Sequence, residues 1–213
     1  HDIKIRLGEG NDKYRPGVAV FVRTMGDVSG SNFDFNTSSL DDLFKASIQQ
    51  KMPFFINTSG IQWTEVYYGK SPLIQKLMGD LKNRVILNDS SPSPRKKQPG
   101  FQDKNGLSYL CMFAPEVEYY WDRNLKQLAA YVSEFARGNP ELFIGISTEN
   151  ETDLPGTWAA GVRDSDYNPY FKKAYNSVSI AMSWQRFRIN SVRDRNEKSA
   201  AILLEAGIPI EKI

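Results

Sequence analysis

The chain of 213 residues carries 27 lysines and arginines against 25 aspartates and glutamates, which gives a formal net charge of +2. Hydrophobic residues make up 40% of it and charged residues 24%, the composition of an ordinary globular domain and not of a disordered chain. This charge balance gives no reason to expect a nucleic-acid or anionic-membrane partner. No stretch approaches the roughly 18 apolar residues of a membrane span.

The scarcity of cysteine and histidine restricts the possible chemistry. The single cysteine, Cys111, excludes an intrachain disulfide and a metal site built from cysteines, and the single histidine, His1, excludes histidine-based triads and clusters. No G-x-G-x-x-G or G-x-x-x-x-G-K-S/T motif follows any predicted strand, so a dinucleotide site or a P-loop has no support. We therefore expect neither a cofactor nor a metal ion, and any catalysis must depend on carboxylates.

The first sixty residues predict two buried strands with a helix between them. Residues 17–23 (GVAVFVR) form a β-branched and aromatic run after a Pro-Gly turn, which is typical of a buried strand. Apolar residues then recur at helical spacing from Leu40 to Ile48, and this helix should end before Pro53. Residues 54–58 (FFINT) predict the second strand, which leads into a polar loop containing Trp63.

The middle of the chain gives weaker signals. Residues 72–82 are compatible with a short helix and residues 84–88 with a short strand, whereas residues 107–113 (LSYLCMF) are a better strand candidate. Between them, residues 90–100 contain three prolines and a basic triplet, and we interpret this segment as a solvated loop.

The second half contains the clearest helix. Its apolar residues recur at steps of four, three, four and three, which places them on one helical face; they are Trp121, Leu125, Leu128, Val132 and Phe135. Gly138 and Pro140 should end this helix. Residues 142–147 (LFIGIS) then predict a third buried strand, residues 177–206 a helix with one or two breaks, and residues 210–213 the opening of another strand.

Alternation of strands and helices predicts parallel strands joined by helical crossovers, with the chemistry at the carboxyl ends of the strands. The strand at 142–147 continues directly into Thr148-Glu149-Asn150-Glu151. Desolvation beside a buried strand can raise the pKa of a carboxyl group, as a general acid requires. On spacing alone, however, a polar loop whose Asn or Glu caps the next turn is the favoured interpretation.

The order of several motifs resembles a known enzyme group. A strand followed by Asn-Glu, after a helix that ends in Gly-Asn-Pro, resembles the fourth-strand signature of the (β/α)8-barrel clan of retaining glycoside hydrolases. Residues 18–60 and 103–151 are similar to the corresponding segments of β-galactosidases of glycoside hydrolase family 42 and related agarase-like enzymes. Trp184, Phe187 and Arg188, followed by AGIPIEKI, resemble the family's path into strand five.

The resemblance implies an α/β fold of the (β/α)8 TIM-barrel type, with residues 1–213 forming one catalytic-barrel segment from about strand one or two to strand five. It implies that Glu151 is the general acid/base and that Asn150 binds the sugar 2-hydroxyl. Glu149 is the competing acid. Arg23 would match an arginine that supports the nucleophile, although a structural ion pair is an equally good interpretation.

A retaining hydrolase also needs a nucleophilic carboxylate about 5 Å from the acid. The family places it at the end of strand seven, so we expect it outside this chain. Trp63 and Trp158 follow strand ends and are candidates for stacking against sugar rings, although a merely buried or surface indole is the more ordinary interpretation of each. The expected partner is a β-linked carbohydrate. Two alternatives stay open: a non-catalytic, carbohydrate-binding barrel relative, and an unrelated α/β domain.

Overall fold

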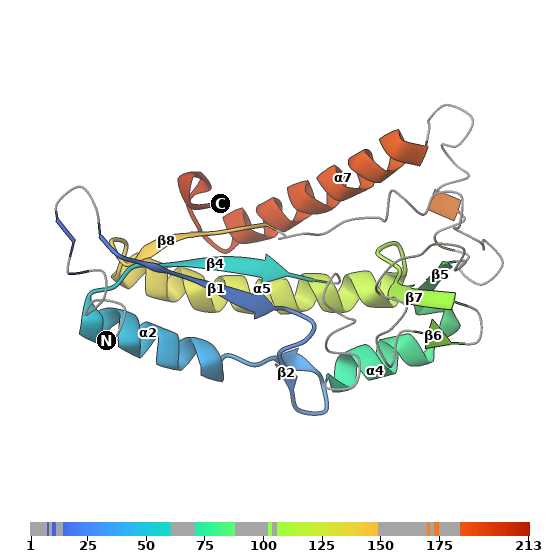
Figure 1. The fold of residues 1–213 in the computed structure, drawn as a ribbon, viewed down its shortest axis with the longest axis horizontal. Coiled ribbons are helices and arrows are strands. Elements are labelled where there is room, and N and C mark those ends of the chain that lie inside the picture. The colour runs from blue at the N-terminus through green and yellow to red at the C-terminus, as the bar shows by residue number, and fades with distance from the viewer. Residues whose placement is uncertain are drawn as a thin grey trace.

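The computed structural model describes residues 8, 10–11, 15–60, 71–87, 102–103, 106–148, 170, 173–174 and 184–213. These residues form an α/β structure built around a three-stranded parallel sheet (Figure 1), which confirms the predicted α/β class. The helices and strands, in chain order, are β1 (Val18–Arg23), β2 (Val28–Ser29), β3 (Asp34–Phe35), α2 (Ser38–Gln50), β4 (Phe54–Ser59), α4 (Pro72–Gly79), β5 (Arg84–Leu87), β6 (Gln102–Asp103), β7 (Gly106–Leu110), α5 (Pro115–Gly138), β8 (Phe143–Ile146) and α7 (Trp184–Glu205).

The parallel sheet has the order β1-β4-β8, so its strands are neighbours in the order in which the chain reaches them. Val18 lies opposite Phe54 and Arg23 opposite Ser59, while Phe54 lies opposite Phe143. All three strands were predicted as buried strands, and their parallel direction was predicted as well. In Figure 1 the arrowheads of β1 and β4 point the same way, toward the ends at which α5 and α7 begin.

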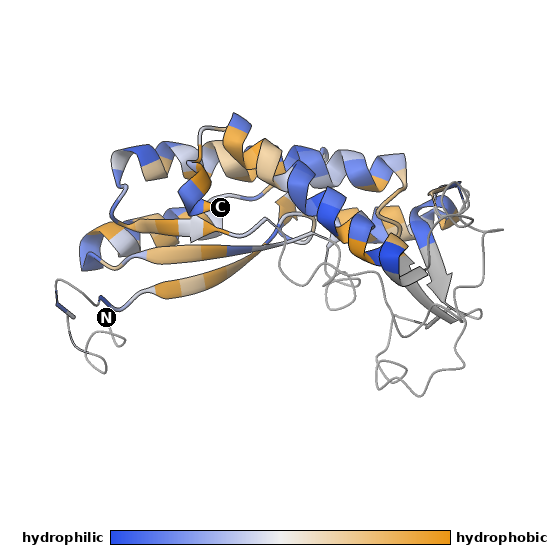
Figure 2. Ribbon diagram, turned by 90° about the horizontal axis from the view of Figure 1, so that it is seen from above, coloured by the Kyte–Doolittle hydropathy of each residue, from blue (hydrophilic) through white to orange (hydrophobic). Residues whose placement is uncertain are grey.

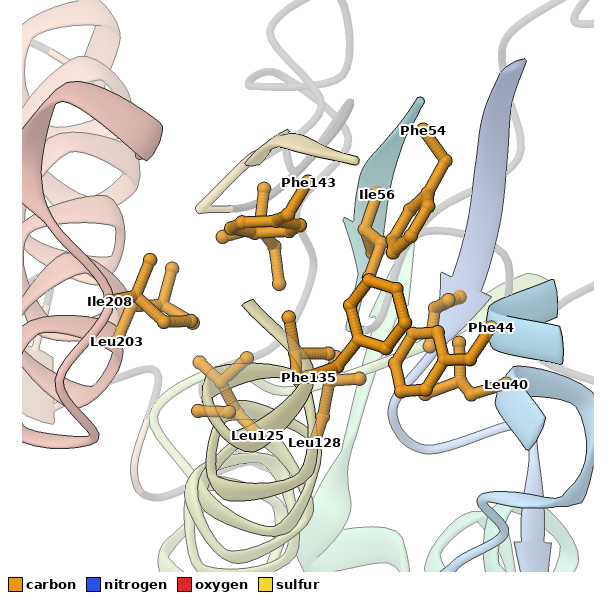
Figure 3. Close-up of a cluster of buried hydrophobic side chains, with 14 of the residues drawn as sticks. Leu40, Phe44, Phe54, Ile56, Leu125, Leu128, Phe135, Phe143, Leu203 and Ile208 are labelled. Atoms are coloured by element: carbon orange, nitrogen blue, oxygen red, sulfur yellow. The ribbon is translucent and has the colours of Figure 1, made fainter. Parts of the chain in front are cut away.

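One face of this sheet packs against helices α2, α5 and α7. Alternate residues of a regular strand point to the same face, and the core on this face includes Val22, Phe54 and Ile56. Phe143 and Ile146 of β8, three residues apart, both join it because the β4–β8 register shifts between Phe54 and Phe55. Leu40 and Phe44 of α2, Leu125 to Phe135 of α5 and Leu203 of α7 complete the same core (Figure 3).

Aromatic rings hold the centre of this core together. The ring centroids of Phe44 and Phe135 are 4.1 Å apart, and Phe54 lies 5.4 Å from Phe135 and 5.9 Å from Phe143. The strands of the parallel sheet are coloured as largely hydrophobic in Figure 2. Phe54 of β4 also contacts Phe44, so its ring connects β4 to helices α2 and α5 and to strand β8.

The opposite face of the sheet is only partly covered. Phe21 is 53% exposed and Ile144 is 48% exposed, although both lie in strands of the sheet. Phe55 and Gly145 are paired across β4 and β8, and both point to this face. The helices that form the core thus pack on one face, and large apolar side chains remain accessible on the other.

A second, antiparallel sheet has the order β5-β7-β6. Strands near residues 84–88 and 107–113 were expected, and here they pair antiparallel. Only two residues separate β6 from β7, and a parallel connection needs a crossover of about a dozen residues or more. The short connection therefore reverses the chain, and β7 ends at Leu110 instead of continuing to residue 113.

The helix predicted around Trp121 is confirmed: α5 runs from Pro115, in its first turn, to Gly138, and its C-cap is Asn139. Helix α2 ends before Pro53, as expected, because Lys51 adopts a left-handed conformation with φ of 47°. Helix α7 covers the later part of the predicted 177–206 segment, of which residues 177–183 lie outside the described residues. The expected solvated loop at 90–100 also lies outside them.

The prediction of a strand at residues 210–213 is wrong. Ile210–Lys212 form a 3-10 helix after Pro209, in which the backbone N–H of Lys212 bonds to the Pro209 carbonyl. The Lys212 ammonium donates to the Phe143 carbonyl at 2.7 Å, where a strand ladder would need a backbone N–H. The segment nevertheless lies directly against β8, the next position along the sheet.

Candidate functional site: the carboxyl edge of the parallel sheet

The carboxyl ends of the three parallel strands lie at one edge of the sheet. Arg23 ends β1 opposite Ser59, which ends β4, and the Ser147 N–H continues the pairing of β8 by bonding to the Ile56 carbonyl at 2.9 Å. Sites in open parallel sheets and in barrels are found at this edge because the connecting loops converge there. We therefore take this edge as the candidate site.

Thr58 fixes the path of the chain as it leaves β8. Its hydroxyl lies 2.8 Å from the carbonyl oxygen of Ser147 and 2.9 Å from that of Thr148, and its backbone N–H donates to the Ser147 hydroxyl at 3.0 Å. The Thr148 hydroxyl is in turn 2.8 Å from Oδ1 of Asn196 on α7. These bonds hold the two residues that immediately precede Glu149 between β4 and α7.

Arg23 is placed at the same edge. It alternates with the buried Val22, so its side chain points to the face of the sheet opposite the helices. Its guanidinium lies 3.4 Å from the carboxylate of Asp27, which also accepts the Arg23 backbone N–H at 3.1 Å. Arg23 thus forms an ion pair with Asp27, and its side chain remains 28% exposed.

Within the described part of the chain, two buried hydroxyls at this edge have no hydrogen-bond partner. They belong to Thr24 and Ser59, which are 0% and 1% exposed. The backbone of Thr24 is nevertheless held in place, since its N–H donates to the Ser59 carbonyl at 3.2 Å and its carbonyl accepts from the Asn124 side chain at 2.8 Å. Because buried polar atoms usually find partners, such unpaired groups often mark functional sites.

Polar side chains of α5 pin the loop that follows β1. Arg123 donates to the carbonyls of Asn32 and Phe33 at 2.7 and 2.6 Å, and Gln127 bonds both to the Phe35 N–H and to the Asp34 carboxylate at 2.8 Å. These contacts hold Phe33 in a left-handed conformation with φ of 57°, which a phenylalanine rarely adopts. The hairpin β2–β3 is thus fixed beside the edge.

The predicted site residues divide into two groups. Arg23 lies at the carboxyl edge, as expected for a residue that ends its strand. Glu151, Asn150 and the competing Glu149 directly follow Thr148, but they lie outside the described residues, and so do Trp63 and Trp158.

Sequence reasoning missed the residues that build the edge, Thr58 and Asn124. Their hydrogen bonds join positions 90 and 100 residues apart in the sequence, so no local pattern predicts them. The one available signal is position: Thr58 continues the alternation of Phe54 and Ile56 in its strand, and Asn124 follows Trp121 by three residues on the same helical face. A polar residue on a buried face usually has a specific partner.

No helix among the described residues combines the length and the hydrophobicity that crossing a membrane requires. In the same part of the chain, no group of three or more histidine, cysteine, aspartate or glutamate side chains is placed to hold a metal ion. Comparison of the sequence with protein-family models and with curated proteins finds no match. The geometry therefore defines an α/β protein whose candidate site is the carboxyl edge of a parallel sheet.

Proposed function

We propose that the chain is part of a retaining glycoside hydrolase barrel that acts on β-linked oligo- or polysaccharides, with galactose-containing ones among the candidates. The observation that carries this proposal is the edge itself. Three parallel strands in chain order bring Arg23, Ser59 and the segment leading to Glu151 to one side of the sheet.

The arrangement of helices supports a barrel segment over a doubly wound sheet. A doubly wound sheet carries helices on both faces and reverses its strand order at a switch point. Here α2, α5 and α7 pack on the same face, and the order β1-β4-β8 follows the chain. In the proposed barrel β1, β4 and β8 are strands two, three and four, and residues 208–213 lie on the side of strand five.

In this proposal Glu151 is the general acid and base. It donates its proton to the glycosidic oxygen as the nucleophile attacks the anomeric carbon, and the leaving sugar departs with that proton. The Glu151 carboxylate then takes a proton from the water that cleaves the covalent intermediate, which restores the acid and frees the nucleophile. We expect strand seven, outside this chain, to carry the nucleophile. Arg23 would support the carboxylate of that nucleophile.

The remaining assignments concern substrate binding. Asn150 would hold the sugar 2-hydroxyl, a contact that strengthens toward the transition state. Trp63 and Trp158 would stack against sugar rings, which aromatic side chains of this size do well. The bonds from Thr58 to Ser147 and Thr148 support these roles because they fix the start of the segment that carries the acid.

The decisive experiment replaces the two competing carboxylates separately in the full-length protein. Glu151→Gln should lower kcat/KM for a β-1,4-linked galacto-oligosaccharide about 10²–10⁴-fold, the usual contribution of a general acid. An aryl β-galactoside with an acidic phenol should lose less, because its leaving group needs little protonation. Glu149→Gln is the matched control and should retain most of the turnover.

Each other result has a definite meaning. Unchanged turnover in Glu151→Gln overturns the role of Glu151, and a loss in Glu149→Gln instead transfers that role to its neighbour. Binding of the oligosaccharide by the wild-type protein without any turnover would identify a non-catalytic, carbohydrate-binding relative of the barrel enzymes.

A further inference from the structure

A cavity of about 470 Å³ lies between α5 and α7, within the size range of small-molecule sites. Helix α7 connects it to the candidate site: Arg195 and Lys198 line the cavity, and Asn196, on the other side of the helix, is the partner of Thr148. The lining residues are Met112, Phe113, Glu118, Ala174, Phe187, Asn190, Ser191, Asp194, Arg195 and Lys198.

One wall of the cavity is aromatic. The rings of Phe113 and Phe187 lie 5.7 Å apart at an interplanar angle of 33°. Met112 and Ala174 extend this apolar surface. Flat apolar walls of this kind suit the C–H faces of a sugar ring, which is apolar above and below and polar around its rim.

Another part of the lining is polar and charged. The guanidinium of Arg195 donates to Asp122 at 2.6 Å and to the Ser199 hydroxyl at 3.0 Å, and it stacks 4.1 Å from the Trp121 ring. The Arg195 side chain is only 5% exposed, and within the described part of the chain its Nε has no hydrogen-bond partner. Its polar groups are therefore mostly engaged inside the protein.

The charges that line the cavity compensate one another. Arg195 and Lys198 are the two cations, and Glu118 and Asp194 the two anions. Lys198 bonds to Glu118 at 2.6 Å and to Asp122 at 2.5 Å. Burial lowers the pKa of Lys198, but these two carboxylates outweigh that effect and raise the pKa above its ordinary value. Lys198 is therefore charged at neutral pH, and the described lining residues, with two cations and two anions, give an ionic ligand no net attraction.

From these features we infer a binding subsite for a neutral sugar unit of the substrate, an inference that rests on the proposed glycosidase function. An aromatic wall stacks on the ring while amide, hydroxyl and paired charged groups bond to its hydroxyls. Helix α7 carries both the cavity lining and, on its other side, Asn196, the partner of Thr148. The subsite would hold a part of the glycan away from the bond that is cleaved.

Isothermal titration calorimetry on the full-length protein tests this inference. The probe is a β-1,4-galactotetraose with sulfur in place of the glycosidic oxygens, because hydrolases do not cleave it and binding is read without catalysis. Ala174→Phe, which fills the cavity, should raise the Kd at least tenfold, and Asn190→Ala should raise it severalfold. The matched control is Ile189→Ala on the same helix, 58% exposed and outside the lining, which should bind like the wild type.

Charge selectivity gives a second readout. Tetragalacturonate, the anionic counterpart, should bind more weakly than the neutral probe at low salt. Equal affinity in Ala174→Phe, Asn190→Ala and the wild type, or preference for tetragalacturonate, would overturn the subsite. The turnover of Glu151→Gln tests the glycosidase function separately. The binding experiment can therefore contradict the subsite without contradicting the catalytic role of Glu151, and the turnover experiment can contradict that role without contradicting the subsite.

Discussion

The two faces of the parallel sheet differ in kind. The face that packs against α2, α5 and α7 is apolar along its length and carries residues such as Phe54 and Ile56 that are 0% exposed. The other face mixes the exposed Phe21 and Ile144 with the polar Arg23 and Asn57. The first face is covered by helices that follow the strands, whereas large apolar side chains of the second face remain accessible. In the proposed barrel, the second face is the interior.

The largest effect expected from this difference concerns two phenylalanines on opposite faces. Phe54→Ala removes a fully buried ring that contacts Phe44, Phe135 and Phe143, and should lower the free energy of unfolding by about 3–5 kcal/mol. Phe21→Ala removes a ring that is 53% exposed and should cost less than about 1 kcal/mol. Urea denaturation followed by circular dichroism measures both. A cost for Phe21→Ala equal to that for Phe54→Ala would show that the second face is fully packed.

A glycine on the second face should give the next largest effect. A Cβ on Gly145 would lie 2.6 Å from the Lys212 carbonyl oxygen and 3.2 Å from the Phe55 ring, so Gly145→Ala forces the C-terminal turn away from β8. We expect a loss of about 1–3 kcal/mol in the free energy of unfolding, as for other overpacked sites. The control is Gly79→Ala at the end of α4, where a Cβ meets no atom within 4 Å. That change should be neutral or slightly stabilising in the same denaturation experiment, and equal effects of the two changes would contradict the close approach.

Two buried threonines at the carboxyl edge allow a sharper test with a smaller effect. Thr58→Val removes a hydroxyl bonded to the carbonyls of Ser147 and Thr148, and should cost about 1–2 kcal/mol because those bonds are lost with little change of shape. Thr24→Val removes a hydroxyl that has no partner, and should be neutral or stabilising. Thermal denaturation of the two variants side by side measures the difference. A destabilised Thr24→Val would mean that its hydroxyl does have a partner.

The sequence predicts the first face better than it predicts the edge, for a physical reason. Burial of one side gives a helix a period in its apolar residues, which located α5, and burial of strands gives short apolar runs, which located all three parallel strands. Apolar patterns do not give the direction of a strand or the structure at the end of a segment. The short β6–β7 connection makes those two strands antiparallel. Residues 210–212 form a 3-10 turn in place of a strand, and the Lys212 side chain bonds to the distant Phe143 carbonyl. The ion pair of Arg23 with Asp27 was predictable as an alternative because its partner is only four residues away. The contact of Thr58 with Thr148 was not predictable, because the two residues are 90 positions apart in the sequence.

The smallest expected effect lies away from both faces, in an ion pair between α4 and α5. The hydrogen bond from Lys76 lowers the pKa of Glu116 below its ordinary value of 4.5, and Asn83 adds to this at 2.8 Å. A lowered carboxyl pKa stabilises the folded state above the ordinary pKa, and that contribution is lost as the pH falls through the folded value. Glu116 and Lys76 are 39% and 40% exposed, so solvent screening limits the effect to less than about 1 kcal/mol. The difference in unfolding free energy between wild type and Glu116→Gln should therefore be constant from about pH 6 to 8 and shrink below about pH 4.5. A difference that grows on acidification would reverse the sign of the coupling, and would mean that Glu116 is held protonated and not ionised.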